Sequence, residues 1–335
     1  MGLCARLSSL LSPSGSVWCR GEGGFGDAAT IFNRNLQRSR EPLAVVAPSS
    51  LDQLRSVLRL SRVEDIRLSV RNGGHNPAGR ALAPSGITVD MSRHRSVTID
   101  RDAALAYVGA GALWRDVYTA LEGSGLYAVG GGCAGVGVTG LSVNGGISFF
   151  SRHRGLVGDG VLSYTLVLPN GTVVHTGSER AHPLHDLHAA LRAGGGSTFG
   201  VIWALRLRLW PLPAGGVGHG ALHLHFPMGV PERFLSTTVD SYLDNLRATA
   251  DDEAWTVDFF LDSTSVSFVF FYDGDSASWR ASGSARGIFD RFANLTAIAS
   301  SEHQAKVHVT GPRTVEAAHQ PSRRMQDASS LREDD

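Results

Sequence analysis

The stretch GGGCAGVGVTGLSVNGG, residues 130–146, decides how this chain is interpreted. It surrounds Cys133 with glycines, so little side-chain bulk stands beside the thiol and a flat ring could approach the backbone closely. The more ordinary role of a single free cysteine is that of a small buried hydrophobic residue. Glycine also clusters at 72–79 and 193–200, so we expect the backbone to come close to something at three places.

A second glycine loop lies earlier in the sequence, in VRNGGHN at residues 70–76. A strand that runs into paired glycines lets successive backbone N–H groups point into one concavity, which is how proteins usually hold a pyrophosphate. His75 stands at the edge of this concavity, where it could bond to a cofactor. A single histidine is more often a hydrogen-bonded structural residue, so this loop alone leaves the role of His75 open.

The first stretch also contains the pattern GxGxxG, formed by Gly135, Gly137 and Gly140 and followed by Asp159. This pattern is typical of a Rossmann nicotinamide site, in which the glycines begin a helix that leads into a second parallel strand. The sequence NGG at 144–146 would break such a helix after one turn. A nicotinamide-dependent dehydrogenase is therefore a second interpretation, and it leaves the histidine loop unexplained.

Composition and charge limit the possible partners. Lysine plus arginine and aspartate plus glutamate both number 31 among 335 residues, so no net field draws the chain to nucleic acid or to an anionic membrane. The apolar share of 42% predicts a globular protein, and a small-molecule ligand suits the charge balance. Three cysteines are too few for a disulfide framework, and no CxxC pair suggests zinc.

The first residues, MGLCARLSSLLSPSG, hold a short apolar run that serines interrupt. The run is no clear signal peptide and is too short to span a bilayer. The localisation therefore stays open between cytoplasmic and secreted. Sequons for N-glycosylation occur at Asn170 and Asn294, and they would matter only after secretion.

Apolar periodicity predicts alternating strands and helices as far as Trp210. The expected strands are 43–47, 66–70, 87–90, 105–109, 161–168, 172–176 and 199–210, and the expected helices begin after Ser49 or Ser50, at 113 and at 184. The turn Pro169-Asn170-Gly171 predicts a hairpin between the strands on either side of it.

Beyond a glycine-rich joint at 214–219 the composition changes. The pattern there predicts an α+β unit on an antiparallel sheet, with strands at 221–226, 255–261 and 266–272 and helices at 231–247 and 278–293. From Gly311 the sequence loses its apolar periodicity, so we expect a disordered tail.

Three segments taken together resemble the flavin domain of the vanillyl-alcohol-oxidase superfamily, and in particular the berberine-bridge-enzyme-like oxidases. R-x-G-G-H is matched by Arg71–His75, and G-x-C-x-x-V-G-V-x-G is matched by Gly131–Gly140. The pattern D-L-x-x-A-L-R-G-G-G-G-x-x-F-G is similar to Asp186–Gly200. Three ordered matches are far more specific than any one of them.

This resemblance implies an α+β fold with a PCMH-type FAD-binding domain of two α/β subdomains at 40–213. A partial α+β substrate domain with an antiparallel sheet is expected at 214–310. The N-terminal segment 1–39 precedes these domains, and the tail 311–335 follows them.

The resemblance also implies FAD held by two covalent bonds, from His75 to the flavin 8α-methyl and from Cys133 to flavin C6. Two such bonds prevent loss of the cofactor and raise its potential toward accepting hydride. In the family, the valine matched by Val136 accompanies ready access of dioxygen. The other residues expected to bind the cofactor lie in the same segments and are Arg71, Asn72, Gly73, Gly74, Asn76, Gly132, Gly135, Val136, Gly137, Gly140, Ser142, Gly145, Gly146, Gly200 and Val201.

The implied activity is that of an FAD-linked oxidase. Hydride would pass from an alcohol, a sugar or a secondary metabolite to the flavin, and dioxygen would then be reduced to hydrogen peroxide. The family's usual tyrosine-rich C-terminal segment has no match after Thr310, so we expect a C-terminally shortened member. A catalytically inactive flavin-binding protein is the alternative within the family. The substrate, the catalytic base and the oligomeric state stay unidentified.

The histidines outside the first loop have ordinary explanations. His182, His185 and His188 recur every three residues, but a proline intervenes and no carboxylate completes a metal site. We therefore expect no metal, and surface histidines at the start of a helix. His223 and His225 share one face of a predicted strand, where we expect them to be exposed to solvent.

Overall fold

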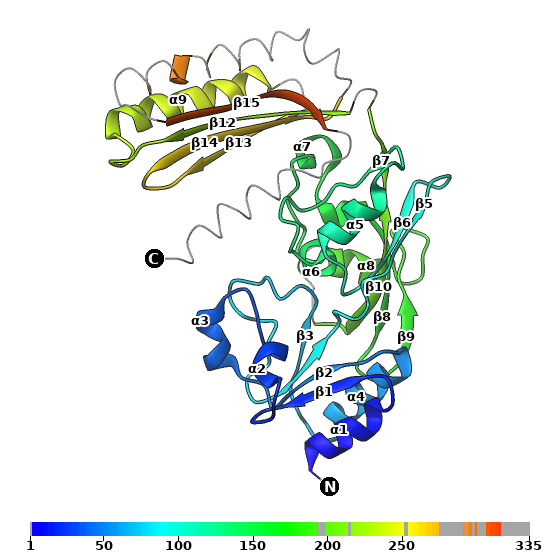
Figure 1. Cartoon of the computed structure of the whole chain (residues 1–335). Coiled ribbons are helices and arrows are strands. Elements are labelled where there is room, and N and C mark those ends of the chain that lie inside the picture. Colours follow the sequence, from blue (N-terminus) through cyan, green and yellow to red (C-terminus); the bar gives the residue numbers. More distant parts are fainter. Residues whose placement is uncertain are drawn as a thin grey trace. The chain divides into compact units, whose positions relative to one another are not determined.

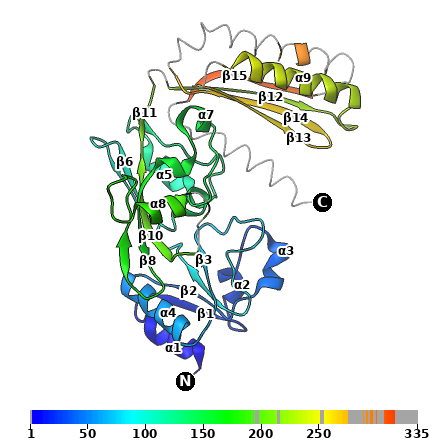
Figure 2. The same cartoon turned by 180° about the vertical axis from the view of Figure 1, so that it is seen from behind.

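The computed structural model describes residues 2–192, 194, 198–213, 216–250, 254–274, 288, 291, 294–296 and 299, and the backbone of 306–315. Internal contacts divide the chain into two units. The first comprises the described residues up to Ser148 and Leu156–Trp210, and the second comprises Phe149–Gly155 and the described residues from Pro211 onward. Figures 1 and 2 show the chain from opposite sides.

The first sheet has four short strands in the order β1, β2, β4, β3. β2, β4 and β3 are parallel to one another, and β1 adds antiparallel to β2. The bounds are β1 (Ser16–Cys19), β2 (Ala44–Ala47), β3 (Leu68–Arg71) and β4 (Ile87–Asp90). Because β1 pairs with β2, the N-terminal segment is part of the first unit.

The helices of this half of the unit are α1 (Leu3–Leu11), α2 (Phe25–Ala28), α3 (Arg34–Gln37), the 3-10 helix η1 (Arg38–Arg40) and α4 (Leu51–Val63). Ser50 caps α4, as predicted, because its side chain accepts a hydrogen bond from the Gln53 backbone N–H. Leu54, Val57 and Leu58 on one face of α4 are buried. The amphipathic pattern of the sequence therefore forms the expected packing face.

A disulfide between Cys4 and Cys19 joins α1 to β1, with their Cα atoms 6.2 Å apart. The expectation that the cysteines form no disulfide framework misses this bond, because nothing in their spacing distinguishes a pair. Leu7 and Leu11 of α1 are buried, and the Gln53 side-chain amide donates to the Leu11 carbonyl at 2.8 Å. The first helix is thus fixed to the body of the unit by covalent and non-covalent contacts.

The second sheet of the first unit is antiparallel and has the strand order β5, β6, β10, β8, β9. Its strands are β5 (Val97–Asp100), β6 (Leu105–Gly109), β8 (Val161–Val167), β9 (Val173–His175) and β10 (Val201–Arg208). The other elements here are α5 (Trp114–Leu121), β7 (Leu126–Tyr127), α6 (Val138–Ser142), η2 (Val157–Gly160), α8 (His185–Arg192) and β11 (Trp210–Pro211). The hairpin predicted at Pro169-Asn170-Gly171 joins β8 to β9, and Gly171 adopts the positive φ of 85° that such a turn requires.

The second unit is a four-stranded antiparallel sheet in the order β13, β14, β12, β15. Its elements are α7 (Ser151–Arg154), β12 (Val217–His225), α9 (Glu232–Ala248), β13 (Trp255–Leu261), β14 (Ser265–Tyr272) and β15 (Lys306–Val315). Figures 1 and 2 both show α9 along one face of this sheet. Buried aromatic side chains form the core between them, including Trp255, Phe268, Phe270 and Phe234.

Helix α7 packs into this unit through a group of polar contacts. Arg152 donates to the backbone carbonyls of Thr249, Ala250 and Trp255. Asp273, whose side chain is 1% exposed, lies 2.8 Å from His153 Nδ1 and 2.7 Å from Arg154 Nε. The segment Phe149–Gly155 lies in the sequence between two parts of the first unit, but it belongs to the second unit.

The predicted α+β class is confirmed, with some differences at element ends. β12 begins at Val217, four residues before the predicted strand, because the pairing with β14 extends into the glycine-rich joint. β15 continues past Thr310 to Val315 and pairs with β12 along its length, so the predicted tail begins too early. The predicted helix 278–293 lies almost wholly outside the described residues, and residues 316–335 lie entirely outside them.

Candidate functional site

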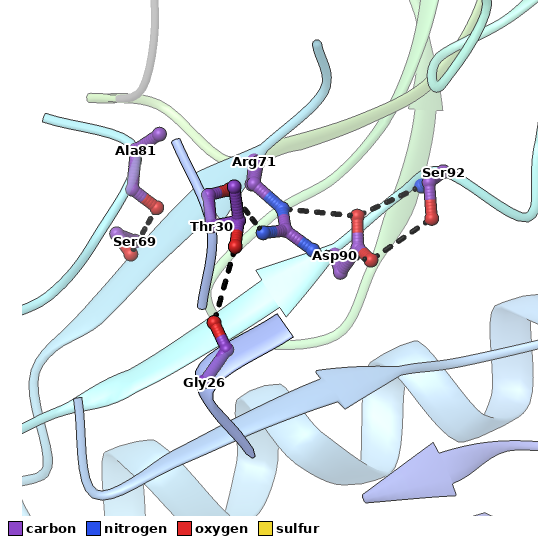
Figure 3. A network of polar contacts seen from close by, with 7 residues as sticks. All are labelled: Gly26, Thr30, Ser69, Arg71, Ala81, Asp90 and Ser92. Atoms are coloured by element: carbon purple, nitrogen blue, oxygen red, sulfur yellow. Dashed lines mark hydrogen bonds and ion pairs between the residues drawn. The ribbon is translucent and has the colours of Figure 1, made fainter. Parts of the chain in front are cut away.

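Arg71 stands at the end of β3, directly before the histidine loop, and is held by a polar network (Figure 3). Its guanidinium lies 2.8 Å from an Asp90 carboxylate oxygen, and it donates to the Thr30 carbonyl at 2.7 Å. The Asp90 carboxylate also accepts hydrogen bonds from the backbone N–H and the hydroxyl of Ser92. Both charged side chains are nearly buried, at 12% and 6% exposed. Arg71, expected from the resemblance to contact the cofactor, therefore also has a structural partner that sequence reasoning missed.

His75 lies two residues past the first glycine of its loop, with its ring stacked on Phe32. The ring centroids are 4.1 Å apart and the planes differ by 20°. Burial lowers the pKa of His75 below its ordinary value, and a backbone hydrogen bond offsets only part of this effect. The imidazole is therefore neutral at pH 7, with a lone pair available on one ring nitrogen.

The rest of the histidine loop is fixed by local bonds. Gly74 adopts a φ of 68°, which favours glycine. The Asn76 side-chain oxygen accepts from the backbone N–H groups of Ala78 and Arg80, and so it caps the turn that follows. Asn76 is thus placed beside His75, with its oxygen used by the protein itself.

The cysteine loop is fastened to the first turns of α5. The backbone N–H groups of Trp114 and Arg115 donate to the carbonyls of Val136 and Ala134. The Tyr118 hydroxyl donates to the Gly131 carbonyl at 2.6 Å. Burial raises the pKa of Tyr118, so its hydroxyl keeps the proton it donates.

Cys133 itself is exposed and free, and the half-buried Gly132 precedes it. The alternative of a small buried hydrophobic residue is therefore wrong for this cysteine. With Cys4 and Cys19 in a disulfide, Cys133 is the one free thiol of the three cysteines.

The two glycine loops meet backbone to backbone at Gly73 and Gly137. A Cβ on Gly73 would lie 2.5 Å from the Gly137 nitrogen, and a Cβ on Gly137 would lie 2.6 Å from the Gly73 nitrogen. The side chains of Asn72 and Thr139 both donate to the Ala110 carbonyl, at 2.7 and 2.9 Å, and so tie the loops to the same peptide. The structure therefore brings together the two segments that carry His75 and Cys133.

Open space lies beside two other glycines of the cysteine loop. A Cβ at Gly135 or Gly140 would have no protein atom within 4 Å. The hydroxyl of Ser142, by contrast, is buried and donates to the Val138 carbonyl within α6. Of the predicted cofactor residues in this loop, these two glycines leave room for a ligand, whereas the Ser142 hydroxyl already donates its proton within the protein.

The Rossmann interpretation of GxGxxG is wrong. α6 has five residues and ends at Ser142, and Gly145 and Gly146 follow with φ values of 84° and 75°. The next strand, β8, is antiparallel to its neighbours β10 and β9, whereas a Rossmann helix leads into a parallel strand. Asp159 accepts a hydrogen bond from the Leu156 backbone N–H and so caps η2.

The third predicted segment reaches the start of β10. A Cβ on Gly200 would lie 2.4 Å from the Val167 carbonyl oxygen, so only glycine fits this approach to β8. Gly200 and Val201 line a cavity of about 340 Å³ together with Val70 of β3. Another cavity, of about 280 Å³, is lined by the next residues along the chain, Arg71–Gly73.

Among the described residues, no group of three or more histidine, cysteine or acidic side chains is arranged to hold a metal ion. His188 is buried, however, and the expectation of three surface histidines is wrong for it. Its Nδ1 lies 3.1 Å from the Thr176 hydroxyl, and burial lowers its pKa to about 4. His223 and His225 are exposed, as expected.

Comparison with known proteins defines the class of the chain. Residues 42–177 match the family described as FAD binding domain, and this range contains both glycine loops. The chain is 42% identical over 175 residues to an FAD-dependent monooxygenase of Cochliobolus heterostrophus. The matched region covers 52% of this chain and 33% of that relative. The chain is 34% identical over 212 residues to the (R)-6-hydroxynicotine oxidase of Paenarthrobacter nicotinovorans, covering 63% and 45%. The chain thus spans less than half the length of these two relatives, and it is an FAD-binding protein.

The fold agrees with that class. BBE-like 1 of Physcomitrella patens superimposes with a TM-score of 0.74 at 22% identity, over 90% of this chain and 62% of that one. Residues 42–177 thus match an FAD binding domain, and the fold is shared with this berberine-bridge-enzyme-like protein, which confirms the predicted fold class. Among the residues that the structure describes, no helix is both long and apolar enough to cross a membrane.

Proposed function

We propose that this protein is a flavin-dependent oxidase that holds FAD along its two glycine loops by covalent bonds from His75 and Cys133. The observation that carries the proposal is the backbone contact between Gly73 and Gly137. Counted from that contact, His75 is two residues away and Cys133 four, which is at most about 7 and 14 Å of extended chain. A single FAD bound at this contact would therefore be long enough to reach both His75 and Cys133.

The local chemistry fits such a cofactor. Gly135 and Gly140 present backbone with open space beside it, which suits the close approach of a ring or a phosphate. The neutral imidazole of His75 and the exposed thiol of Cys133 are nucleophiles of the kind that form carbon–nitrogen and carbon–sulfur bonds. Each bond would replace a C–H bond of the flavin, and the two electrons released would reduce the flavin and then pass to dioxygen. The backbone N–H groups of both loops would hold the pyrophosphate.

Bound FAD would accept a hydride from the substrate and pass two electrons to dioxygen, which with two protons gives hydrogen peroxide. The substrate class we propose is an alcohol, a sugar or a secondary metabolite with an oxidisable C–H bond. An oxidase and a monooxygenase among the relatives support a reaction with dioxygen. Val136, at the turn after Cys133, would leave the approach of dioxygen open.

Peptide mapping of the purified chain is the direct test of attachment. Flavin should remain on the protein after acid precipitation and should be found on peptides that contain His75 and Cys133. His75→Ala and Cys133→Ala should each leave one link, and the double variant should release all flavin to acid. Flavin that acid extracts completely from correctly folded wild-type protein would contradict the proposal.

A thiol titration gives an independent readout, because Cys133 is the one cysteine outside the disulfide. Without reductant, the flavin-loaded protein should show no reactive thiol, and His75→Ala should show the same result. One reactive thiol in a fully loaded protein would mean that Cys133 carries no flavin. A protein with both links but no peroxide release over a panel of alcohols and sugars would support the inactive alternative.

Gly73→Ala should reduce both stability and flavin content, because its new Cβ meets the backbone of Gly137 at 2.5 Å. Overpacking of this kind typically costs about 1–3 kcal/mol, and rigid backbone favours the upper end. Gly160→Ala is the matched control, since its Cβ also meets no protein atom within 4 Å and Gly160 lies outside both glycine loops. Urea unfolding and flavin absorbance should show Gly73→Ala impaired in both. Equal unfolding midpoints for the two variants would argue against the contact.

A further inference from the structure

The turn between β8 and β9 presents the sequence Asn170-Gly171-Thr172 to solvent. Asn170 and Thr172 are exposed. The turn is closed by backbone hydrogen bonds at 2.8 Å, from Leu168 to the Thr172 carbonyl and from Gly171 to the Leu168 carbonyl. The Arg55 side chain on α4 also donates to the Gly171 carbonyl at 2.8 Å, which holds the turn against the body of the unit.

The Asn170 side chain is oriented by its own turn. Its Oδ1 accepts a hydrogen bond from the Thr172 backbone N–H at 2.9 Å. Its Nδ2 makes no hydrogen bond to any residue that the structure describes. The carboxamide is thus held by its oxygen, and the nitrogen is left facing solvent on an exposed turn.

The Cys4–Cys19 disulfide supplies an observation from a different part of the molecule. Such bonds form and persist in oxidising compartments, including the lumen of the secretory pathway. That lumen is also where Asn-X-Thr sequences receive glycans.

We propose that Asn170 is an N-glycosylation site. In the transfer, Asn170 Nδ2 forms a bond to the anomeric carbon of a sugar, while the bond from that carbon to the diphosphate of a lipid-linked oligosaccharide donor breaks. The amide nitrogen loses one proton and the lipid diphosphate leaves. The product keeps Oδ1, so the hydrogen bond from Thr172 survives the modification.

The second sequon of the chain differs in its surroundings. Asn294 is exposed, but Leu295 is fully buried in the aromatic core of the second unit. Gly171, the middle residue of the first sequon, is buried too, so the two sequons differ at their third residue: Thr172 is exposed, whereas Thr296 is half-buried. Asn170 therefore belongs to the sequon whose two recognition residues are both exposed.

The test uses the full chain secreted from a eukaryotic host behind an added secretion signal. Peptide N-glycosidase should shift its electrophoretic mobility and leave aspartate at position 170, detected by peptide mass spectrometry. Thr172→Ala should lose this glycan, while Thr172→Ser should keep it, and both retain the backbone N–H that orients Asn170. Asn294→Gln should leave the modification at Asn170 unchanged.

The overturning result is an unmodified Asn170 peptide in secreted protein whose Cys4–Cys19 bond is shown by non-reducing mapping to be intact. The intact disulfide shows that the chain has folded, so the missing glycan then means that Asn170 is not a glycosylation site. Loss of the glycan in Thr172→Ser as well would also contradict the proposal, because that variant keeps the recognition sequence.

Discussion

Asp90→Asn is expected to lower the free energy of unfolding by about 3–5 kcal/mol, the usual cost of removing one partner from a buried ion pair. The substituted amide would keep the shape of the side chain but leave the Arg71 guanidinium, 12% exposed, without its counter-charge. The hydrogen bonds from Ser92 to the carboxylate would weaken as well. Urea denaturation at pH 7 should show a lower midpoint with an unchanged slope.

The matched control is Asp52→Asn on the surface of α4. Asp52 pairs with Arg55 at 3.2 Å, but its side chain is 89% exposed. Exposed pairs contribute about 0–1 kcal/mol, so this variant should unfold close to the wild type. Equal losses in the two variants would mean that the Arg71–Asp90 pair is worth no more than a surface contact. Arg71→Met combined with Asp90→Leu should recover part of the loss, since no buried charge then remains alone.

Replacing both Cys4 and Cys19 by serine is expected to lower the free energy of unfolding by roughly 3 kcal/mol. The bond closes a loop with a sequence separation of 15, and a cross-link of this size restricts the unfolded chain by about that amount. Calorimetry without reductant should show the loss, and reductant should then have no further effect on the variant.

Cys133→Ser is the control for this loss, since Cys133 is exposed and lies outside the bond. When both proteins are prepared and measured without flavin, Cys133→Ser should unfold at the same temperature as the wild-type protein. A double serine variant that also unfolds with the wild type would mean that α1 is held by the burial of Leu7 and Leu11 and by Gln53, and that the disulfide adds nothing.

Local sequence patterns predicted several elements to the residue. β4, β6 and β13 begin and end where their apolar runs and bordering turn residues place them. The short helix α6 also follows from the sequence, because glycines at 145 and 146 take positive φ values that end it. These features depend on neighbours in the chain, which a single sequence displays directly.

Features that depend on tertiary contact were not predictable in this way. Asp90 meets Arg71 because β3 and β4 are parallel neighbours, and apolar periodicity does not specify which strands pair. His188 is buried together with Leu191 on one face of α8, although the sequence predicted surface histidines at the start of this helix. The contact of Gly73 with Gly137 joins two motifs that the sequence showed only as separate loops.

Helix α7 has a consequence for recombination among related proteins. Its segment, Phe149–Gly155, lies in the sequence between two parts of the first unit but packs within the second. A hybrid that exchanged only the residues after Trp210 would remove the partners of Arg152 and Arg154 and would deprive the buried Asp273 of His153. The second unit is therefore encoded by two separate stretches of sequence. A crossover that keeps this unit intact must exchange the α7 segment together with the residues after Trp210. We therefore expect this pair of units to evolve by gradual substitution more readily than by domain exchange.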